Sequence, residues 1–146
     1  METRMTPQRL RSTSTWLLGQ ATTHAHRLVT DALGAVGARR YHYSLMAALE
    51  EFGPASQADL GRRGGLDRSD VVATVNELAD RGFVERRPDP ADRRRNIVNI
   101  TPSGEAHLRH LDQVLGQAQD ALLAPLSAAE REELARMLNA VLKHHG

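Results

Sequence analysis

The sequence predicts a mainly α-helical protein with one small β-hairpin. Aromatic residues make up only 3% of the 146 residues, so the core must be aliphatic, which favours helices. Apolar residues recur at steps of three and four over most of the chain, as they do along one face of a helix. Between residues 83 and 101, two short runs rich in β-branched and aromatic residues instead flank an arginine-rich turn, which indicates a hairpin.

Two helices are expected in the first third of the chain, over residues 8–36 and 41–52. The first carries apolar residues at helical spacing: Leu18, Ala21, Ala25, Leu28, Ala32 and Val36. The second places four apolar residues on one side: Leu45, Ala48, Leu49 and Phe52. Gly53-Pro54 ends this second helix.

The next two helices are short and joined by a glycine turn. Ser56 can cap a helix over 57–63, with Ala58 and Leu60 facing inward. Gly64-Gly65 provides a tight turn that tolerates positive φ. Asp67 then caps a longer helix that runs to about Arg81 and closes on Gly82; its apolar positions are Val71, Val75 and Leu78. This order is the helix-turn-helix pattern.

The hairpin follows at once, so the unit is winged. Its strands are expected over 83–87 and 97–100, and the Asp89-Pro90 turn leads to three consecutive arginines at the tip. A hairpin that projects positive charge suits the narrow, electronegative minor groove of DNA. The alternative is a solvated hairpin whose arginines only keep the sheet edge soluble.

Two further helices complete the chain. The first, over about 104–124, places leucines at Leu108, Leu111, Leu115 and Leu122, with Ala118 between them, as a heptad seam of about two repeats. Residues 127–130 form a capping box for the last helix. That helix carries a further apolar stripe: Leu134, Met137, Leu138, Val141 and Leu142.

These terminal helices predict a dimer. A winged helix-turn-helix needs only the central half of this chain for its core, so apolar helices at both ends need another surface to bury against. A second copy of the chain is the economical solution, because two-fold dimers are the commonest assemblies. Two wings that read a pseudo-palindrome also need a fixed spacing. The alternative is packing within one larger monomeric bundle.

Composition and charge narrow the function classes. The chain has no cysteine, which excludes disulfides, thiolate zinc sites and cysteine redox sensing. No apolar run approaches a membrane span and the N-terminus lacks a signal-peptide core, so we expect a cytoplasmic protein. Net charge is only +1, yet six arginines crowd into one region, the electrostatic footprint of a nucleic-acid face: Arg81, Arg86, Arg87, Arg93, Arg94 and Arg95. No nucleophile, phosphate-loop or metal-protease motif indicates an enzyme.

The whole chain resembles the MarR family of bacterial transcriptional regulators. The resemblance is carried by Gln-Ala-Asp-Leu at 57–60, Leu-Asp-Arg-Ser-Asp-Val at 66–71, the segment 77–86 and the Asp89–Gly104 stretch. It implies a single domain over 1–146, with a DNA-binding part at 41–104 and dimerisation helices at 8–36 and 105–146. It further implies a homodimer on operator double-stranded DNA, usually a repressor that a small ligand releases.

The resemblance also implies which residues face DNA. The helix that starts at Arg68 is similar to the family's recognition helix, and its candidates are Arg68, Ser69, Asp70, Val72, Ala73 and Asn76. Arg68 matches the O6 and N7 acceptors of guanine, whereas Ser69 and Asp70 could instead only complete the helix cap. In the wing, Arg94 is the candidate for minor-groove insertion, and Asp92 pairs with a neighbouring arginine to shape the loop. Arg93 and Arg95 meet phosphates or hold the hairpin.

The effector is the least determined part of the prediction. Trp16, Tyr41, His42 and Tyr43 are the candidate ligand pocket, although such residues could equally pack a helix junction. A zinc-responsive regulator using His24, His42, His107 and His110 is the alternative, because histidines at i and i+3 share a helix face. The family's zinc spacing is not reproduced, so the leading expectation includes no metal and no cofactor. A winged helix that has lost DNA binding is a third possibility, which the intact arginine tip argues against.

Overall fold

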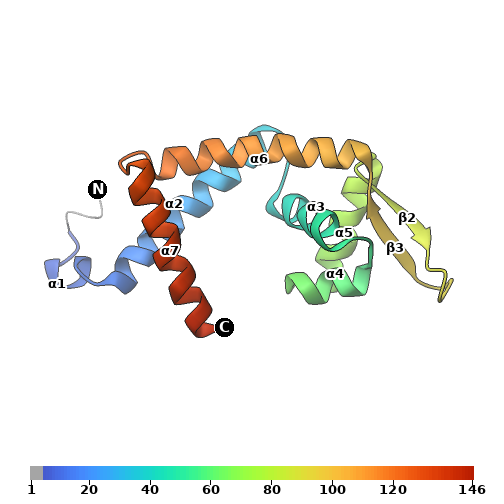
Figure 1. Ribbon diagram of the computed structural model, residues 1–146, viewed down its shortest axis with the longest axis horizontal. Helices are drawn as coiled ribbons and strands as arrows, with labels where there is room; N and C mark the ends of the chain where they lie inside the picture. The colour runs from blue at the N-terminus through green and yellow to red at the C-terminus, as the bar shows by residue number, and fades with distance from the viewer. Residues whose placement is uncertain (1–4) are drawn as a thin grey trace. The chain divides into compact units, whose positions relative to one another are not determined.

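The computed structural model describes residues 5–146, which form two compact units. The winged unit is Thr30–Leu115, and the terminal unit joins the described residues 5–29 to Gly116–Gly146. As Figure 1 shows, the fold is mainly helical with one small sheet, as the sequence predicted. No helix of the described residues is long and apolar enough to cross a membrane.

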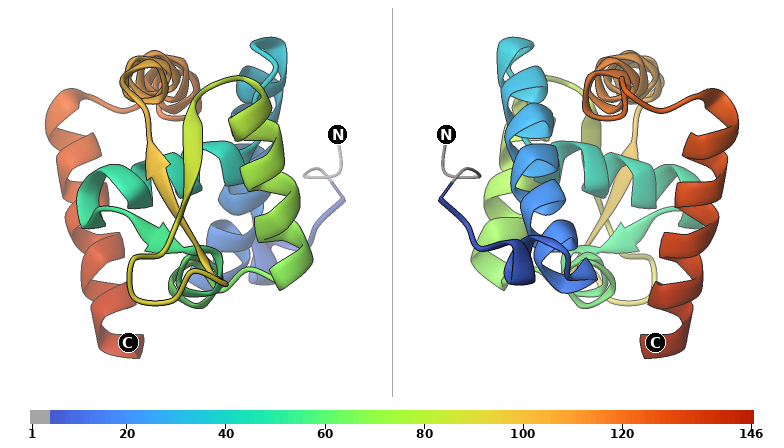
Figure 2. Two further views of the ribbon diagram at one scale, coloured as in Figure 1. Left: turned by 90° about the vertical axis from the view of Figure 1, so that its right-hand side faces the viewer. Right: turned by 90° about the vertical axis from the view of Figure 1, so that its left-hand side faces the viewer.

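The winged unit is built on three helices and a three-stranded antiparallel sheet. The helices are α3 (Arg40–Phe52), α4 (Gln57–Gly64) and α5 (Arg68–Asp80), and the strands are β1 (Ala55–Ser56), β2 (Val84–Pro88) and β3 (Asn96–Ile100). The strand order is β1-β3-β2, so β3 lies in the centre. In Figure 2 the sheet lies against α3, while α5 stands beside the hairpin. The sequence predicted only the hairpin, because two residues of β1 are too few to show strand alternation.

The core of the winged unit is aliphatic, as predicted. α5 buries the expected apolar side, Val71, Val75 and Leu78, and β3 alternates buried Val98 and Ile100 with half-buried neighbours. Burying one such side chain contributes about 1.5–3 kcal/mol of favourable transfer free energy. The side chains that are fully out of solvent come from every layer of the unit: Leu33, Met46, Val71, Val75, Leu78, Val98 and Leu111.

The helix ends follow the sequence signals with two corrections. Ser56 accepts a hydrogen bond from the backbone N–H of Asp59 at 3.1 Å and so caps α4, and Gly65 has a left-handed φ of 62°. Asp67 stands at the start of α5, but its side chain makes no capping hydrogen bond. Ala58 was expected to face inward and is exposed, because a helix of this length buries only the side around Leu60.

A tight junction holds the root of the hairpin against α6 (Pro102–Leu122). Thr101 Oγ1 donates to the carbonyl of Gly82 at 2.6 Å and accepts from the N–H of Gly104 at 3.0 Å. The N–H of Thr101 donates to the carbonyl of Phe83 at 3.0 Å. A Cβ on Gly104 would lie 2.0 Å from that Phe83 carbonyl oxygen. The Thr-x-x-Gly pattern is therefore explained by close packing of α6 on the turn that follows α5.

The terminal unit contains α1 (Gln8–Arg11), the first part of α2 (Ser14–Ala35), the last part of α6 and α7 (Ala128–His145). The expected single helix over 8–36 is interrupted at residues 12 and 13. There the hydroxyls of Ser12 and Thr13 donate to the carbonyls of Gln8 and Leu10, and such bonds compete with helix continuation. The predicted capping box of α7 is present, with Ser127 and Glu130 bonding each other's backbone N–H groups.

Burial revises the predicted seam on α6. Leu108 and Leu111 are already buried within the single chain, at 4% and 0% exposure, so they belong to its core and offer no surface to a partner. Leu115 and Leu122 are half-buried. The periodicity located the apolar side of α6 but could not tell an internal contact from an intermolecular one.

Candidate nucleic-acid interface

The exposed side of α5 carries most of the residues that the sequence proposed for DNA contact. Five of them are exposed: Arg68, Ser69, Val72, Ala73 and Asn76. Arg68, Val72 and Asn76 follow at intervals of four, so they share one helix face. Asp70 is half-buried, and its carbonyl accepts the hydroxyl of Thr74 at 2.7 Å. It therefore lies at the border of this face.

Two aspartates shape the tip of the wing. Asp89 Oδ1 accepts the N–H of Ala91 at 2.9 Å, and Asp92 Oδ1 accepts the N–H of Arg94 at 3.1 Å. Such side-chain-to-backbone bonds over two residues fix tight turns. The N–H of Asp89 also donates to the carbonyl of Arg95 at 2.8 Å, which closes the loop. Sequence analysis assigned the loop shape to Asp92 and placed Asp89 only in the turn with Pro90.

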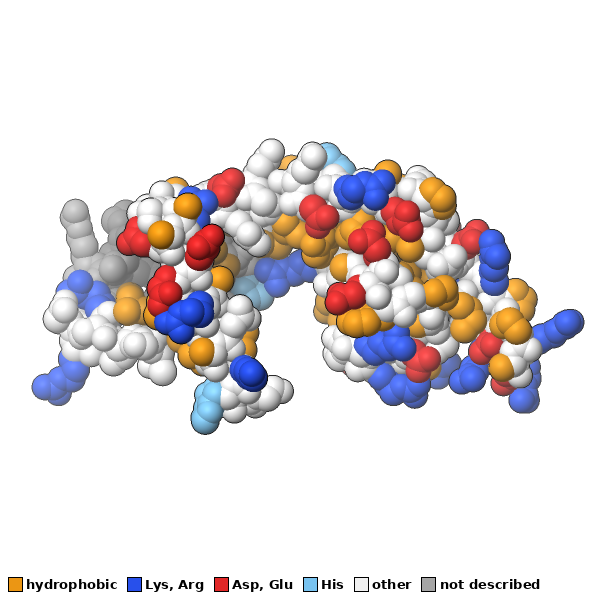
Figure 3. Space-filling view, viewed as in Figure 1, with side chains coloured by type: hydrophobic (Ala, Val, Ile, Leu, Met, Phe, Trp, Pro, Cys, Tyr) orange, Lys and Arg blue, Asp and Glu red, His pale blue; other side chains and the backbone are white. Residues whose placement is uncertain are grey.

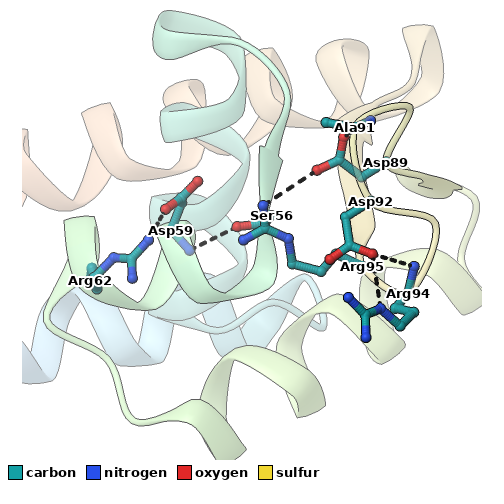
Figure 4. Close-up of polar contacts among 8 residues, drawn as sticks. All are labelled: Ser56, Asp59, Arg62, Asp89, Ala91, Asp92, Arg94 and Arg95. Atoms are coloured by element: carbon teal, nitrogen blue, oxygen red, sulfur yellow. Dashed lines mark hydrogen bonds and ion pairs between the residues drawn. The ribbon is translucent and has the colours of Figure 1, made fainter.

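The three tip arginines differ in how they are held, and Figure 4 shows two of them, Arg94 and Arg95, beside the turn aspartates. Arg94 Nε lies 3.2 Å from Asp92 Oδ1, although the Arg94 side chain is 91% exposed. The backbone N–H of Arg94, and then its guanidinium, hold the pKa of Asp92 below its usual range. Arg95 pairs with Asp89 at 3.8 Å. Arg93 is exposed and forms no ion pair within residues 5–146. The expected pairing of Asp92 with a neighbouring arginine is thus present.

The wing and α5 border a common cleft of about 690 Å³. Its floor includes Leu66, Val71 and Val72, and its lining contains four arginines: Arg62, Arg68, Arg94 and Arg95. Figure 3 shows Lys and Arg side chains gathered over the end of the hairpin and the lower edge of the winged unit. Asp59 is the nearest counter-charge on α4, and Arg62, bonded to it, lowers the pKa of that carboxyl. The cleft therefore has a strongly cationic wall.

Arg86 connects three elements of the site through hydrogen bonds. Sequence analysis had counted it only as part of the basic charge. Arg86 on β2 donates from Nε to Gln57 Oε1 at 3.2 Å and from Nη2 to Asn76 Oδ1. It thereby links the wing to the first residue of α4 and to α5. No spacing in the sequence brings residues 57, 76 and 86 together, because the contact depends on the tertiary packing of three elements.

The proposed ligand-pocket residues do not line the cleft described above. Tyr41 is 42% exposed, and Trp16 is half-buried in the terminal unit. Tyr43 donates its hydroxyl to Asp112 Oδ1 at 2.6 Å. This bond raises the pKa of Tyr43 to about 12. His42, which is buried, has its own contacts inside the winged unit.

His42 is engaged through both ring nitrogens. Nδ1 accepts the N–H of Arg39 at 3.2 Å, so the ring proton lies on Nε2, which is 2.6 Å from Glu77 Oε2. Arg39 also bonds Glu77, and Arg39, followed by His42, lowers the pKa of the Glu77 carboxyl. His42 and Glu77 thus join the start of α3 to α5.

The four histidines of the zinc alternative are not brought together. Within residues 5–146, no group of three His, Cys, Asp or Glu side chains is placed to hold a metal ion. His24 contacts Arg27 on α2, and His107 stacks on Phe83 with ring centroids 4.1 Å apart. His107 and His110 have ring centroids 6.2 Å apart. The i and i+3 spacing correctly predicted that these two rings lie near each other. Among residues 5–146, no third side chain joins them to form a metal site.

Comparison with known proteins gives consistent matches. Residues 37–95 match the model of the MarR family. The chain is 31% identical over 137 residues to the HTH-type transcriptional regulator YcgE of Bacillus subtilis. This alignment covers 90% of this chain and 86% of YcgE. It is 33% identical over 97 residues, 66% of this chain, to the HTH-type transcriptional repressor NicR of Pseudomonas putida. The matches to NicR and to a regulatory protein for the hcr operon of Thauera aromatica span only 61% of each relative.

Solved structures agree on the fold. A probable transcriptional regulator from Pseudomonas aeruginosa superposes with a TM-score of 0.73 at 30% identity, covering 90% of this chain and 98% of that one. MarR from E. coli superposes with a TM-score of 0.79 at 23% identity, covering 89% and 96%. PcaV from Streptomyces coelicolor, solved with its natural ligand, gives 0.69 at 26% identity over 94% and 96%. All three cover both units of the chain.

Proposed function

Because this chain belongs to the MarR family of transcriptional regulators, we propose that it binds a pseudo-palindromic operator as a homodimer, represses transcription there and is released by a small ligand. Repression is supported by the likeness to NicR, which is described as a transcriptional repressor. The helix α5 would occupy the major groove and the wing the adjacent minor groove.

One observation carries the DNA-binding proposal: the exposed side of α5 and the wing tip border the same arginine-lined cleft. Arg68 from α5 and Arg94 from the wing both line it, although they lie 26 positions apart in the sequence. Cations from two elements on one surface suit a duplex, whose phosphates supply most of the binding free energy. A hairpin kept soluble by its arginines would not need a second cationic element beside it.

The terminal unit supports the homodimer. Of its described residues only Ala118 is buried, and α7 contains no buried residue. Met137, Val141 and Leu142 are 46%, 49% and 68% exposed on α7. Helices in proteins gain most of their stability from packing an apolar face, so this unit lacks a core of its own. A second copy of the same helices would supply one, as in symmetric dimers.

The small-ligand part of the proposal rests on family relatives. PcaV, at 26% identity, has been solved with its natural ligand. In this chain Tyr41, His42 and Tyr43 of the winged unit remain our candidates for contact with an effector, and Trp16 of the terminal unit is a separate candidate. A ligand that disturbs the bond between His42 and Glu77 would act on α5 directly.

Selection from a random-sequence DNA pool tests the proposed function. We expect an inverted repeat whose half-sites are about one helical turn apart, 10–10.5 base pairs from centre to centre. Gel-shift titration of the selected site should show one dimer per repeat. If the protein retains no DNA from the pool at low salt, it is not a DNA-binding regulator.

A further inference from the structure

We propose that Arg86 is a positioning residue that holds the amide of Asn76 so that only its NH₂ group faces DNA, which makes Asn76 select guanine or thymine instead of adenine. The proposal rests on the proposed function, since it concerns how the exposed side of α5 reads a base edge. It adds a determinant of sequence preference that lies outside the recognition helix.

The contacts come from one half-buried guanidinium. Arg86 points from β2 toward the helices, where its Nε donates to Gln57 Oε1 at 3.2 Å and its Nη2 donates to Asn76 Oδ1. Arg86 is paired with Val98 in the β2–β3 register, so the sheet fixes its backbone. Two side-chain bonds then fix the guanidinium plane, and with it the rotation of the Asn76 amide.

The chemistry of the guanidinium decides which side of the amide faces outward. Arginine has five N–H donors and no acceptor, so Asn76 must turn its oxygen toward Arg86. The Asn76 side chain is otherwise exposed, and its NH₂ group is left for an external partner. Asparagine recognises adenine by accepting from N6 and donating to N7 at once, which needs both amide atoms on the same base edge. An amide whose oxygen faces β2 does not offer that pair.

The external partner must therefore be a hydrogen-bond acceptor. In the major groove guanine presents two acceptors, N7 and O6, and thymine presents O4, whereas adenine presents a single acceptor, N7, beside the N6 donor that the outward NH₂ group cannot satisfy. Asn76 shares its helix face with Arg68 and Val72, which places it on the side proposed to enter the groove. We therefore assign to Asn76 one position of each half-site at which guanine or thymine is preferred.

Five proteins test this assignment by selection from a random DNA pool: the unchanged protein, Asn76→Ala, Arg86→Met, the double variant of these two and Arg87→Met. Arg87 is the next residue of β2, is exposed and pairs with Glu85 at 2.7 Å. Its replacement removes the same charge without touching either amide, so it is the matched control. The position that loses its preference in Asn76→Ala identifies the base that Asn76 reads.

We expect that position to be guanine or thymine in the unchanged protein and in Arg87→Met. In Arg86→Met the amide is free to rotate, and adenine should gain about tenfold there, as for a good bidentate contact. Adding Asn76→Ala to Arg86→Met should abolish the gain. Adenine in the unchanged protein, an Arg86→Met preference equal to the control, or an Asn76→Ala variant weakened evenly on all sequences would each overturn the assignment.

A measurement without DNA separates this proposal from the proposed function. In the free protein, the Nη–H resonance of Arg86 should shift in Asn76→Ala, because Nη2 donates to Asn76 Oδ1. It should stay in place in Ser69→Ala, which alters the same exposed side of α5. An unchanged Arg86 resonance in Asn76→Ala would show that the contact is not made in solution. Failure of the unchanged protein to retain any DNA would instead reject the proposed function.

Discussion

At the tip of the wing, the aspartates fix the shape of the turn and the arginines provide its positive charge. Asp89 and Asp92 accept backbone N–H groups and set the turn, whereas Arg94 keeps 91% of its side chain exposed beside Asp92. Because the backbone N–H of Arg94 also holds Asp92, the loop does not depend on the guanidinium alone. Arg94 can therefore be removed without loss of the turn.

Replacing Arg94 with alanine should weaken operator binding and reduce the slope of log affinity against log salt by about one, because one cation is lost from the groove. Arg109→Ala is the matched control, since Arg109 is exposed on α6 and does not line the arginine-lined cleft. Fluorescence anisotropy titrations measure the affinity and the salt slope of the two variants. They are run between roughly 50 and 200 mM salt, the range over which phosphate contacts change affinity strongly. Equal slopes in the two variants would contradict the role of Arg94.

Gly104 is the residue at which packing leaves least room. A Cβ there would overlap the Phe83 carbonyl oxygen at 2.0 Å and Ile100 Cγ1 at 2.8 Å. Gly104→Ala should lower the free energy of unfolding by about 1–3 kcal/mol or more, as overpacking does. Gly116→Ala on the same helix meets no atom within 4 Å and should raise it by about 1 kcal/mol. Urea unfolding of both variants tests the contrast, and equal midpoints would argue against the close contact.

At the scale of elements, the junction of α5, β2 and α6 is joined by rings as well as by hydrogen bonds. Phe83 stacks on His107 with an interplanar angle of 7°, and the Arg81 guanidinium lies 4.9 Å from the centroid of the Phe83 ring. His107 Nε2 is buried and finds no hydrogen-bond partner among residues 5–146. Desolvation, followed by the charges of Arg81, His110 and His42, lowers the pKa of His107.

The lowered pKa of His107 predicts a loss of stability in mild acid. The unfolded chain, in which a histidine titrates near about 6.5, binds the proton more readily than the folded chain. The free energy of unfolding should therefore fall as the pH drops below about 6.5 toward the folded-state pKa. His107→Phe keeps a ring against Phe83 and should remove this part of the pH dependence. Urea midpoints at pH 7.5 and 5.5 provide the measurement, with exposed His26→Gln as control; a variant as acid-sensitive as the unchanged protein would contradict it.

The elements that the sequence predicted well have local signals. α5 has an apolar face and a glycine at its end, and the hairpin has alternating apolar residues and turn aspartates. β1 was missed because its two residues become a strand only by pairing with Ile97 and Val98. The bond of Arg86 to Asn76 was missed for the same reason: partners ten positions apart meet only through tertiary packing. Ser12 and Thr13 broke a helix that apolar periodicity alone made continuous.

At the scale of the whole molecule, the two units differ in how far they bury their apolar side chains. The winged unit contains nearly all of the buried side chains, including Leu108 and Leu111 of α6. The terminal unit exposes its apolar residues, such as Leu17 at 50% and Leu142 at 68%. The sequence predicted that the terminal helices need a partner surface, but it assigned part of that surface to leucines that the chain buries itself.

Exposed α7 residues are therefore the better place to test the dimer. Val141→Glu puts a charge in the middle of the stripe, and burying it unpaired should weaken association about a hundredfold or more. Ala129→Glu adds the same charge to an exposed position of α7. Its neighbours on the helix face are Glu132 and Glu133, which lie outside the stripe. Sedimentation should show a monomer for Val141→Glu and a dimer for Ala129→Glu, each with an unchanged helical spectrum.

The same pair of variants links assembly to DNA binding. A dimer holds two winged units on one inverted repeat, and losing this bivalency should cost about 10²–10⁴ in affinity for the full repeat without changing any contact to DNA. Val141→Glu and Ala129→Glu should then bind an isolated half-site with equal affinity, because the winged unit is unchanged in both. A Val141→Glu protein that sediments as a dimer and binds the full repeat normally would place the interface elsewhere than on α7.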